Sequence, residues 1–307
     1  MASSRCLLLS LVGLLVAGCT LPSAAPTDTT VPVHTSLPTS TVKPTSPPKT
    51  TALQASPQPA PTAAFTEAVA PVIFTIVFDN NESDQRLETA WGFSCLVEGL
   101  EKTILFDTGG DSGLLLRNMH ILGIDPTIVD VVVISHVHGD HVGGLAGFLQ
   151  ENHAVTVYLP QSFPQNIKDA TRDAGAELVE VAGPVRLCDL VYSTGELGAW
   201  IKEQSLVIQT AQGLVVITGC AHPGVVGIVR RAKELRDGEI HLVLGGFHLG
   251  GASEGKIAGI VTEFQQLGVQ RVAPCHCSGE LTRRVFRDAY GENFIPAGVG
   301  SRLEVRE

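Results

Sequence analysis

Four metal-binding side chains lie within the segment 135–141 of this chain. They are His136, His138, Asp140 and His141. The preceding apolar run 129–134 predicts a buried strand, and alternate residues along a strand point to the same face. Gly139 then lets the chain turn, so the aspartate and the last histidine leave from the start of the next helix. Two pairs of donors from two directions suit two metal ions: imidazole favours zinc, and the carboxylate adds manganese or iron.

A single histidine after a buried strand is usually a hydrogen-bonded structural residue. Here that explanation must account for three histidines and one aspartate together. They follow the carboxyl end of a strand, where α/β folds place their ligand sites. The pattern therefore favours a metal site, which still needs its structural context.

Three more histidines follow apolar runs in the second half of the chain, and each adjoins glycine or cysteine. They are His222 after the run 214–218, His248 after 240–244 and His276 after 271–274. Equivalent positions at three strand ends indicate one site shared between two halves of a fold. By contrast, His120 lies in a predicted helix, His153 in a polar loop and His241 at the start of a strand, so we expect these to be structural or solvent-facing.

The order of apolar runs predicts two successive halves, each rich in strands before its helices. Predicted strands are 72–78, 92–97, 103–106, 129–134, 155–159, 178–181, 185–187, 190–193, 206–210, 214–218, 240–244 and 271–274. Predicted helices are 112–122, 142–150, 161–174, 225–236, 254–267 and 280–289. Two such halves suggest sheets packed face to face with helices outside, an α/β fold of the four-layer αββα sandwich type. The polar loop 79–90 is expected at the surface as a substrate-side flap. This loop and the loop 195–204 are expected to set specificity.

The N-terminus has the features of an export signal. Arg5 precedes the apolar run 6–17, and small residues lead to Cys19. This pattern predicts a lipoprotein-type signal peptide over residues 1–18, with Cys19 lipidated as the mature N-terminus. An ordinary signal peptide with an incidental cysteine is the alternative. The protein is thus expected to be exported and anchored by lipid to the outer face of the cell membrane.

Residues 19–66 are dominated by Pro, Thr and Ser and include ten of the eighteen prolines. Such a segment buries too little apolar surface to offset its conformational entropy, so it predicts a disordered tether. Residues 67–307 are enough for one domain with a large core.

The composition of the chain limits the classes of partner that we expect. The net charge is −10 and no cluster of Lys or Arg stands out, which argues against nucleic-acid binding and leaves a small molecule as the expected substrate. Nothing in the sequence indicates an oligomeric state. Five cysteines remain in the domain, so at least one thiol is unpaired. Cys275 and Cys277 flank His276 as expected wall residues, too close along the chain for a mutual disulfide.

Four motifs in order resemble the metallo-β-lactamase superfamily of metal-dependent hydrolases. They are Ser-His-Val-His-Gly-Asp-His (135–141), Thr-Gly-Cys-Ala-His-Pro-Gly (218–224), Gly-Gly-Phe-His-Leu (245–249) and Pro-Cys-His-Cys-Ser-Gly (274–279). Within it, they are similar to the branch of the ribofuranosylaminobenzene-phosphate synthases, which join a dihydropterin to a sugar-phosphate precursor. The resemblance covers residues 72–305, and it is more specific for the branch than for the reaction.

The resemblance implies two divalent metal ions, with zinc expected and manganese or iron as alternatives. It assigns three side chains to each metal. The first set is His136, His138 and His222, and the second is Asp140, His141 and His276. Many members carry a bridging aspartate where this chain has Cys220. That cysteine either ligates as a thiolate, which favours zinc, or is a buried structural thiol.

Asp107 ends the run 103–106 and precedes Thr108-Gly109-Gly110. The resemblance implies that this carboxylate supports a metal-binding histidine from behind, fixing its tautomer. An N-cap of the helix 112–122 is the alternative.

We expect hydrolysis of an ester, lactone or phosphoester by a metal-activated water. Asp140 is the expected ligand and proton acceptor, and His248 the expected contact to the substrate or developing oxyanion. One alternative is a synthase that forms a carbon–nitrogen bond to a dihydropterin. Another is a surface lipoprotein that binds metal without catalysis.

Overall fold

A computed structural model describes residues 71–306. The predicted signal peptide (1–18), its Cys19 and the tether (19–66) lie outside the described residues. No helix among residues 71–306 is both long and apolar enough to span a membrane.

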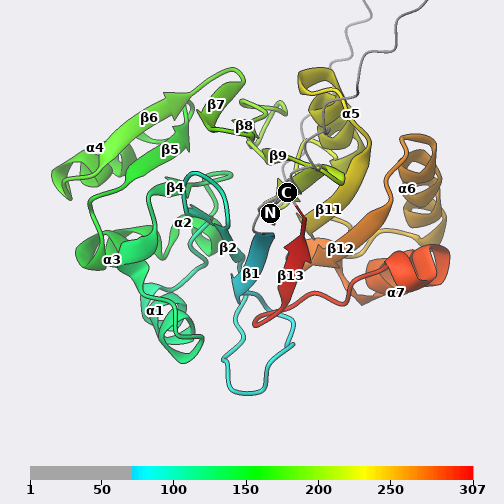
Figure 1. The fold of residues 1–307 in the computed structure, drawn as a ribbon, viewed down its shortest axis with the longest axis horizontal. Coiled ribbons are helices and arrows are strands. Elements are labelled where there is room, and N and C mark those ends of the chain that lie inside the picture. The colour runs from blue at the N-terminus through cyan, green and yellow to red at the C-terminus, as the bar shows by residue number, and fades with distance from the viewer. Residues whose placement is uncertain (1–70, 307) are drawn as a thin grey trace, which may run out of the picture. The chain divides into compact units, whose positions relative to one another are not determined.

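Two β-sheets form the centre of the domain (Figure 1). The seven-stranded sheet has the order β13-β1-β2-β3-β4-β5-β6, and its strands from β3 to β6 run parallel. The six-stranded sheet has the order β12-β11-β10-β9-β8-β7, with β10, β11 and β12 parallel. The strands of the first sheet are β1 (Val72–Phe78), β2 (Ser94–Glu98), β3 (Ile104–Phe106), β4 (Val131–Val133), β5 (Thr156–Pro160), β6 (Glu177–Val181) and β13 (Arg302–Val305). Those of the second are β7 (Val185–Cys188), β8 (Val191–Ser193), β9 (Leu206–Thr210), β10 (Gly213–Thr218), β11 (Ile240–Gly246) and β12 (Arg271–Cys275).

The helices cover the outer faces of both sheets (Figure 1). On the first sheet they are α1 (Ser112–Ile121), α2 (Gly139–Val142), α3 (Leu145–Glu151) and α4 (Gln165–Asp173). On the second they are α5 (Val225–Leu235), α6 (Glu254–Gln266) and α7 (Glu280–Tyr290). Short 3-10 turns lie at Pro126–Ile128, His276–Ser278 and Gly291–Asn293.

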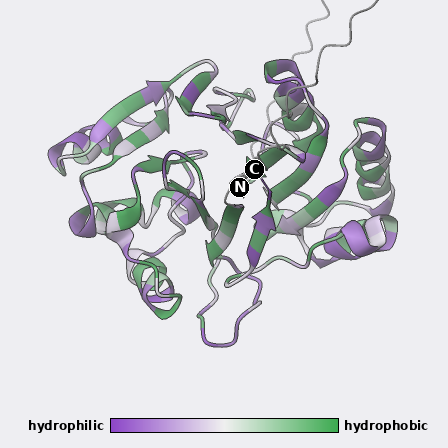
Figure 2. Ribbon diagram, in the orientation of Figure 1, coloured by the Kyte–Doolittle hydropathy of each residue, from purple (hydrophilic) through white to green (hydrophobic). Residues whose placement is uncertain are grey.

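Three layers of buried apolar residues hold these elements together. The central layer lies between the sheets and joins residues such as Phe106 of β3 to Ile217 of β10. One outer layer packs the first sheet against α1 and α3, and the other packs the second sheet against α5, α6 and α7. Figure 2 shows hydrophobic residues concentrated on the strands and hydrophilic residues on outer helices such as α4 and α7. The predicted αββα sandwich is confirmed.

The structure differs from the sequence prediction in three elements. The predicted helix 142–150 is two helices, α2 and α3, which meet at Gly143 and Gly144. A Cβ at Gly144 would lie 2.1 Å from the carbonyl oxygen of Thr108. The segment that follows β3 therefore leaves no room for a side chain at this position. The helix predicted from 161 begins only at Gln165, after Pro164. Strand β13 was not predicted, and it pairs antiparallel with β1.

The parallel strands determine where the loops of interest lie. The segments that carry the predicted site residues follow the ends of parallel strands. These strands are β3 and β4 in one sheet, and β10, β11 and β12 in the other. Because parallel strands end at the same edge of their sheet, these loops gather at one edge of each sheet.

Candidate metal centre

The structure brings the predicted donor residues of both halves together in two adjoining groups. The first group is His136, His138 and His222; the second is Asp140, His141, Cys220 and His276. The first reproduces the set that the resemblance implies, and the second adds Cys220 to it. In each group, one donor atom per residue lies within 4.8 Å of all the others.

The first group consists of three imidazoles. His138 Nδ1 lies 3.1 Å from His136 Nε2 and 3.2 Å from His222 Nε2. Ligands about 2.0–2.1 Å from a tetrahedral zinc are separated by about 3.3 Å, so the group has the dimensions of a zinc site. His136 is fully buried, whereas His138 and His222 are partly exposed. Three protein donors with a solvent-facing side leave a coordination position open.

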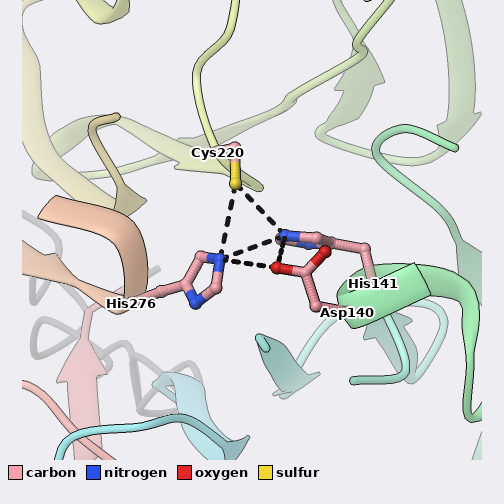
Figure 3. A group of neighbouring side chains, drawn as sticks. All are labelled: Asp140, His141, Cys220 and His276. Atoms are coloured by element: carbon pink, nitrogen blue, oxygen red, sulfur yellow. Dashed lines mark hydrogen bonds and ion pairs between the residues drawn. The ribbon is translucent and has the colours of Figure 1, made fainter. Parts of the chain in front are cut away.

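The second group has four donors and is more deeply buried (Figure 3). His276 Nε2 lies 3.2 Å from His141 Nε2, 3.4 Å from Cys220 Sγ and 3.3 Å from Asp140 Oδ2. Cys220 Sγ is 3.3 Å from His141 Nε2. These separations again match a tetrahedral zinc, and the mixed nitrogen, sulfur and oxygen donors suit it chemically.

Hydrogen bonds behind the rings fix the tautomers in the second group. Asp107 Oδ2 lies 2.7 Å from His141 Nδ1. A carboxylate accepts, so Nδ1 carries the proton and Nε2 presents a lone pair to the group. His276 Nδ1 is 3.0 Å from Asn80 Oδ1, which places its proton in the same way. In the neutral rings the two Nε2 lone pairs thus face each other at 3.2 Å. A cation between them satisfies both.

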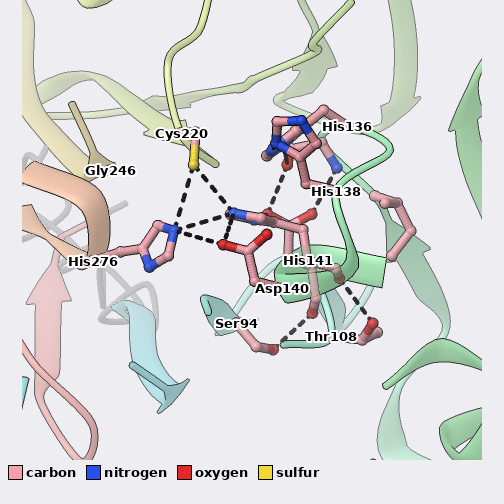
Figure 4. A network of polar contacts seen from close by, with 12 residues as sticks. Ser94, Thr108, His136, His138, Asp140, His141, Cys220, Gly246 and His276 are labelled. Carbon is pink, nitrogen blue, oxygen red and sulfur yellow. Dashed lines mark hydrogen bonds and ion pairs between the residues drawn. The ribbon is translucent and has the colours of Figure 1, made fainter. Parts of the chain in front are cut away.

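Asp107 also orients a ring of the first group, that of His136, which Figure 4 shows near His141 of the second group. Ser135 donates to it twice, from its backbone nitrogen at 2.6 Å and from Oγ at 2.7 Å. Because the Ser135 hydroxyl proton is used in the hydrogen bond to Asp107, Ser135 Oγ accepts a hydrogen bond from His136 Nδ1 at 2.9 Å. His136 Nε2 is left as a lone pair toward its own group. Asp111, rather than Asp107, caps helix α1.

Burial and neighbouring charges set the protonation of the donors. Burial lowers the pKa of His136, and burial together with the charges of His248 and His138 lowers the pKa of His222 to about 4. Burial by itself raises the pKa of Asp140, but the hydrogen bond to His276 and the charge of His141 outweigh it, and the pKa lies below its usual range. Near neutral pH His136, His222 and Asp140 are unprotonated donors. Burial by itself lowers the pKa of His141, but the charge and the hydrogen bond of Asp107 outweigh it and raise that pKa.

The backbone around the donors adopts unusual angles. Four of the five non-glycine residues with positive φ in residues 71–306 lie at these strand ends. They are Asp107 (58°), Ala221 (61°), His248 (52°) and His276 (48°). Side chains with a Cβ disfavour this region, and such residues cluster at functional sites.

Two buried carboxylates beside the donors were not predicted. Glu203 accepts the backbone N–H groups of Cys220 at 3.0 Å, Ala221 at 2.8 Å and His222 at 2.8 Å. It holds the whole Cys-Ala-His turn, and burial raises its pKa to about 7. Asp79 accepts the backbone N–H of His276 at 3.1 Å, and burial raises its pKa too. Asp79 begins the loop 79–90 expected at the surface, and that expectation is wrong for this residue because its carboxylate is buried.

The remaining predicted residues lie near the two groups or far from them. His248 is exposed and lies outside these two groups, with its ring centroid 4.3 Å from that of His222. With Cys220 and His222 it forms a third set of donors whose atoms lie within 4.8 Å of one another. Trp91 is 60% exposed and contacts the ring of His276. His120 and His153 are exposed, and His241 is buried against Gln270.

The cysteines of the described domain are all free thiols. Cys277 donates to the backbone carbonyl of Cys220 at 3.6 Å and so lies beside the second group. Cys275, expected in the same wall, lies at the end of β12 and is completely buried. Cys275 packs in the core between the sheets, whereas Cys277 Sγ lies beside Cys220, and a 3-10 turn begins at His276 between them.

The sequence model of the metallo-beta-lactamase superfamily matches residues 92–234 of this chain. A curated relative is the 7,8-dihydropterin-6-methyl-4-(beta-D-ribofuranosyl)-aminobenzene-5'-phosphate synthase of Methanocaldococcus jannaschii. It is 27% identical over 271 residues, which cover 72% of this chain and 92% of the relative. An uncharacterized protein of the same organism is 29% identical and covers 74% of this chain and 98% of its own length.

Solved structures support the same family. One described as a metal-dependent hydrolase of the beta-lactamase superfamily is 29% identical, with a TM-score of 0.66 over 77% of this chain and all of that one. The short form of human tRNase Z, at 14% identity and a TM-score of 0.54, covers 76% of this chain and 100% of its own, and shares the fold.

Proposed function

We propose that this protein is a metal-dependent hydrolase that cleaves an ester, lactone or phosphoester. The observation that carries the proposal is the set of nitrogen lone pairs that Asp107 and Asn80 direct into the two adjoining groups. Five imidazoles, one carboxylate and one thiolate would hold two divalent ions, with zinc favoured by the mixed donors. A bound zinc ion supplies Lewis acidity, which lowers the pKa of water and polarises a carbonyl or phosphoryl oxygen.

The chain's own residues supply the rest of the chemistry. The Asp140 carboxylate is ionised and partly exposed, so it can accept a proton from a nucleophilic water and return it to the leaving group. His248 stands beside the open side of the first group, where its ring can hydrogen-bond the substrate or a developing oxyanion. The Asp107 and Glu203 carboxylates position the donors without reaching the substrate.

Metal analysis of the full chain followed by a panel of lactones, phosphodiesters and thioesters tests the proposal. We expect two equivalents of divalent metal and turnover of at least one class. His248→Ala should lower kcat without releasing metal. Two bound equivalents with no turnover of any class would instead favour a non-catalytic metal-binding protein.

A synthase reaction is the second candidate, because the relative from Methanocaldococcus jannaschii aligns over 72% of this chain. Incubation with a dihydropterin diphosphate and a ribofuranosylaminobenzene 5'-phosphate tests it. Product that forms only when both substrates are present would support the synthase, and hydrolysis of the diphosphate alone would support the hydrolase.

We also propose export and lipid anchoring at Cys19, on the basis of the N-terminal sequence pattern. Metabolic labelling with a radioactive fatty acid should mark the wild-type chain and leave Cys19→Ala unlabelled. Equal labelling of both chains, or of neither, would contradict the anchor.

A further inference from the structure

A cavity of about 170 Å³ opens beside the metal-binding groups, between helices α5 and α6. His222 and His248 form part of its lining, so the cavity adjoins the open side of the first group. Apolar walls come from Val226 of α5, Leu249 after β11 and Ile260 of α6. A dry cavity of about 150 Å³ holds a benzene-sized group, so there is room here for a short carbon chain.

Besides the two histidines, the cavity lining contains one polar side chain, that of Lys256. Lys256 lies in the first turn of α6, where its backbone N–H donates to the N-cap Ser253 Oγ at 3.4 Å. Its side chain is exposed, and no carboxylate in residues 71–306 forms an ion pair with it. The first turn of a helix favours acidic side chains because of the helix dipole. A lysine at this position therefore opposes the helix, and helix formation does not explain it.

The negative charge of the rest of the chain makes the positive charge of Lys256 important for attracting an anionic ligand. The protein carries a net charge of −10, so its field repels anions at long range. An unpaired ammonium group beside the open side of the donor cluster then becomes the local point that attracts an anionic substrate group. An apolar wall with one cation matches a ligand that is apolar along its length and negatively charged at its end.

We propose that this cavity is a substrate subsite that selects a short apolar chain ending in a carboxylate or phosphate, with Lys256 as the residue that determines this specificity. The proposal rests on the proposed function, since it places the bond to be cleaved at the adjoining donor groups. His248, at the border of the cavity and the donors, then contacts the substrate near that bond.

The test is calorimetric binding to the full-length, zinc-loaded protein with four ligands that share a three-carbon chain. All four carry one carboxylate and differ at the opposite end, which is an uncharged methyl group in butyrate, a second carboxylate in glutarate, a phosphonate in 4-phosphonobutyrate and an ammonium in 4-aminobutyrate. We expect glutarate or 4-phosphonobutyrate to bind about tenfold more tightly than butyrate, the effect of one charge-assisted hydrogen bond. The tighter of the two identifies the anion. The 4-aminobutyrate should bind more weakly than butyrate.

Variants of the lysine complete the test. Lys256→Met should remove the tenfold preference and leave the affinity for butyrate unchanged, and Lys256→Arg should keep the preference. Lys256→Glu should reverse it in favour of 4-aminobutyrate. Lys233→Met is the matched control, because Lys233 lies in the last turn of α5, outside the cavity lining. Equal affinities for the four ligands, or a preference that survives in Lys256→Met, would overturn the proposal.

Binding and turnover separate this subsite from the proposed function. If the anionic preference depends on Lys256 but no ester is hydrolysed, the subsite stands and the hydrolase proposal fails. If esters are hydrolysed and Lys256→Met leaves both binding and the KM for anionic esters unchanged, the hydrolase stands and the subsite fails.

Discussion

The two donor groups share one support, Asp107, but differ in composition and surroundings. The second group has four donors of three chemical kinds, and its three least exposed members are completely or almost completely buried. The first has three imidazoles, two of them partly exposed. A site closed by four protein donors holds its metal for structure, whereas a site with three donors and an open side can present its metal to a substrate. On the proposed function, the first group would present its ion to the substrate, whereas the second would retain its ion and contribute the partly exposed Asp140 as proton acceptor.

The number of donors can be tested by removing one. His138→Ala leaves the first group with only two donors, so we expect the protein to lose one metal equivalent and more than about a hundredfold in turnover, since even outer partners cost 10–100-fold. Metal analysis and steady-state kinetics measure both. His153→Ala, an exposed histidine away from the donors, is the control. Full metal content and turnover in His138→Ala would remove the difference between the groups.

The shared support predicts a coupled effect. In Asp107→Asn an amide replaces the carboxylate facing His141 Nδ1 and Ser135, so one ring in each group loses its fixed tautomer. Affinity for both metals should fall by about 10–100-fold. A chelator titration followed by metal analysis reads out each equivalent. Asp111→Asn keeps the cap of α1 and serves as control. Loss of a single metal would show that the groups are supported separately.

The thiol of the closed group gives a smaller effect. Cys220→Ser leaves three good donors there, so the metal should stay bound with an affinity for zinc lower by about tenfold, comparable to loss of a supporting partner. Cys220→Asp should retain the metal and shift the preference toward manganese. Competition between zinc and manganese for the protein measures this preference, and Cys188→Ser is the control. An unchanged zinc affinity in Cys220→Ser would make Cys220 a structural thiol.

The smallest effect is expected at Glu203, which supports the turn 220–222 behind the donor groups. Glu203→Gln cannot accept all three N–H groups of the turn, because its amide nitrogen faces the N–H of one residue. One buried donor left unpaired costs about 1–3 kcal/mol, so urea unfolding of the metal-free protein should show that loss. Glu196→Gln, a loop carboxylate that accepts one N–H of Ser162, is the control. Equal stability of the two variants would remove Glu203 from the support of the site.

Much of this could be predicted from sequence because its signals are local. The αββα layers follow from apolar runs of strand and helix length, and the donor segments follow from histidines beside glycine at strand ends. Four of the donors, His136, His138, Asp140 and His141, lie within one segment. Each of the histidines His222, His248 and His276 follows its own strand end.

The parts that were missed depend on contacts between distant segments. Asp79 and Glu203 lie in polar loops, and their burial arises only when they meet backbone N–H groups 197 and 17 to 19 residues away. Strand β13 is four residues long and alternates exposed with buried residues, and it becomes a strand by pairing with β1 at the other end of the domain. The split of the helix 142–150 follows from the close approach of Thr108 to Gly144.

The left-handed residues at the strand ends also affect how the protein can evolve. Each non-glycine residue in that conformation costs about 1–3 kcal/mol, which glycine would not incur. Selection for heat resistance alone would thus favour glycine at His248, whose exposed ring serves the site. It would not favour glycine at Asp107, where the buried donors of Ser135 and His141 would be left unpaired. A thermostable variant with glycine at His248 should keep its metal and lose turnover.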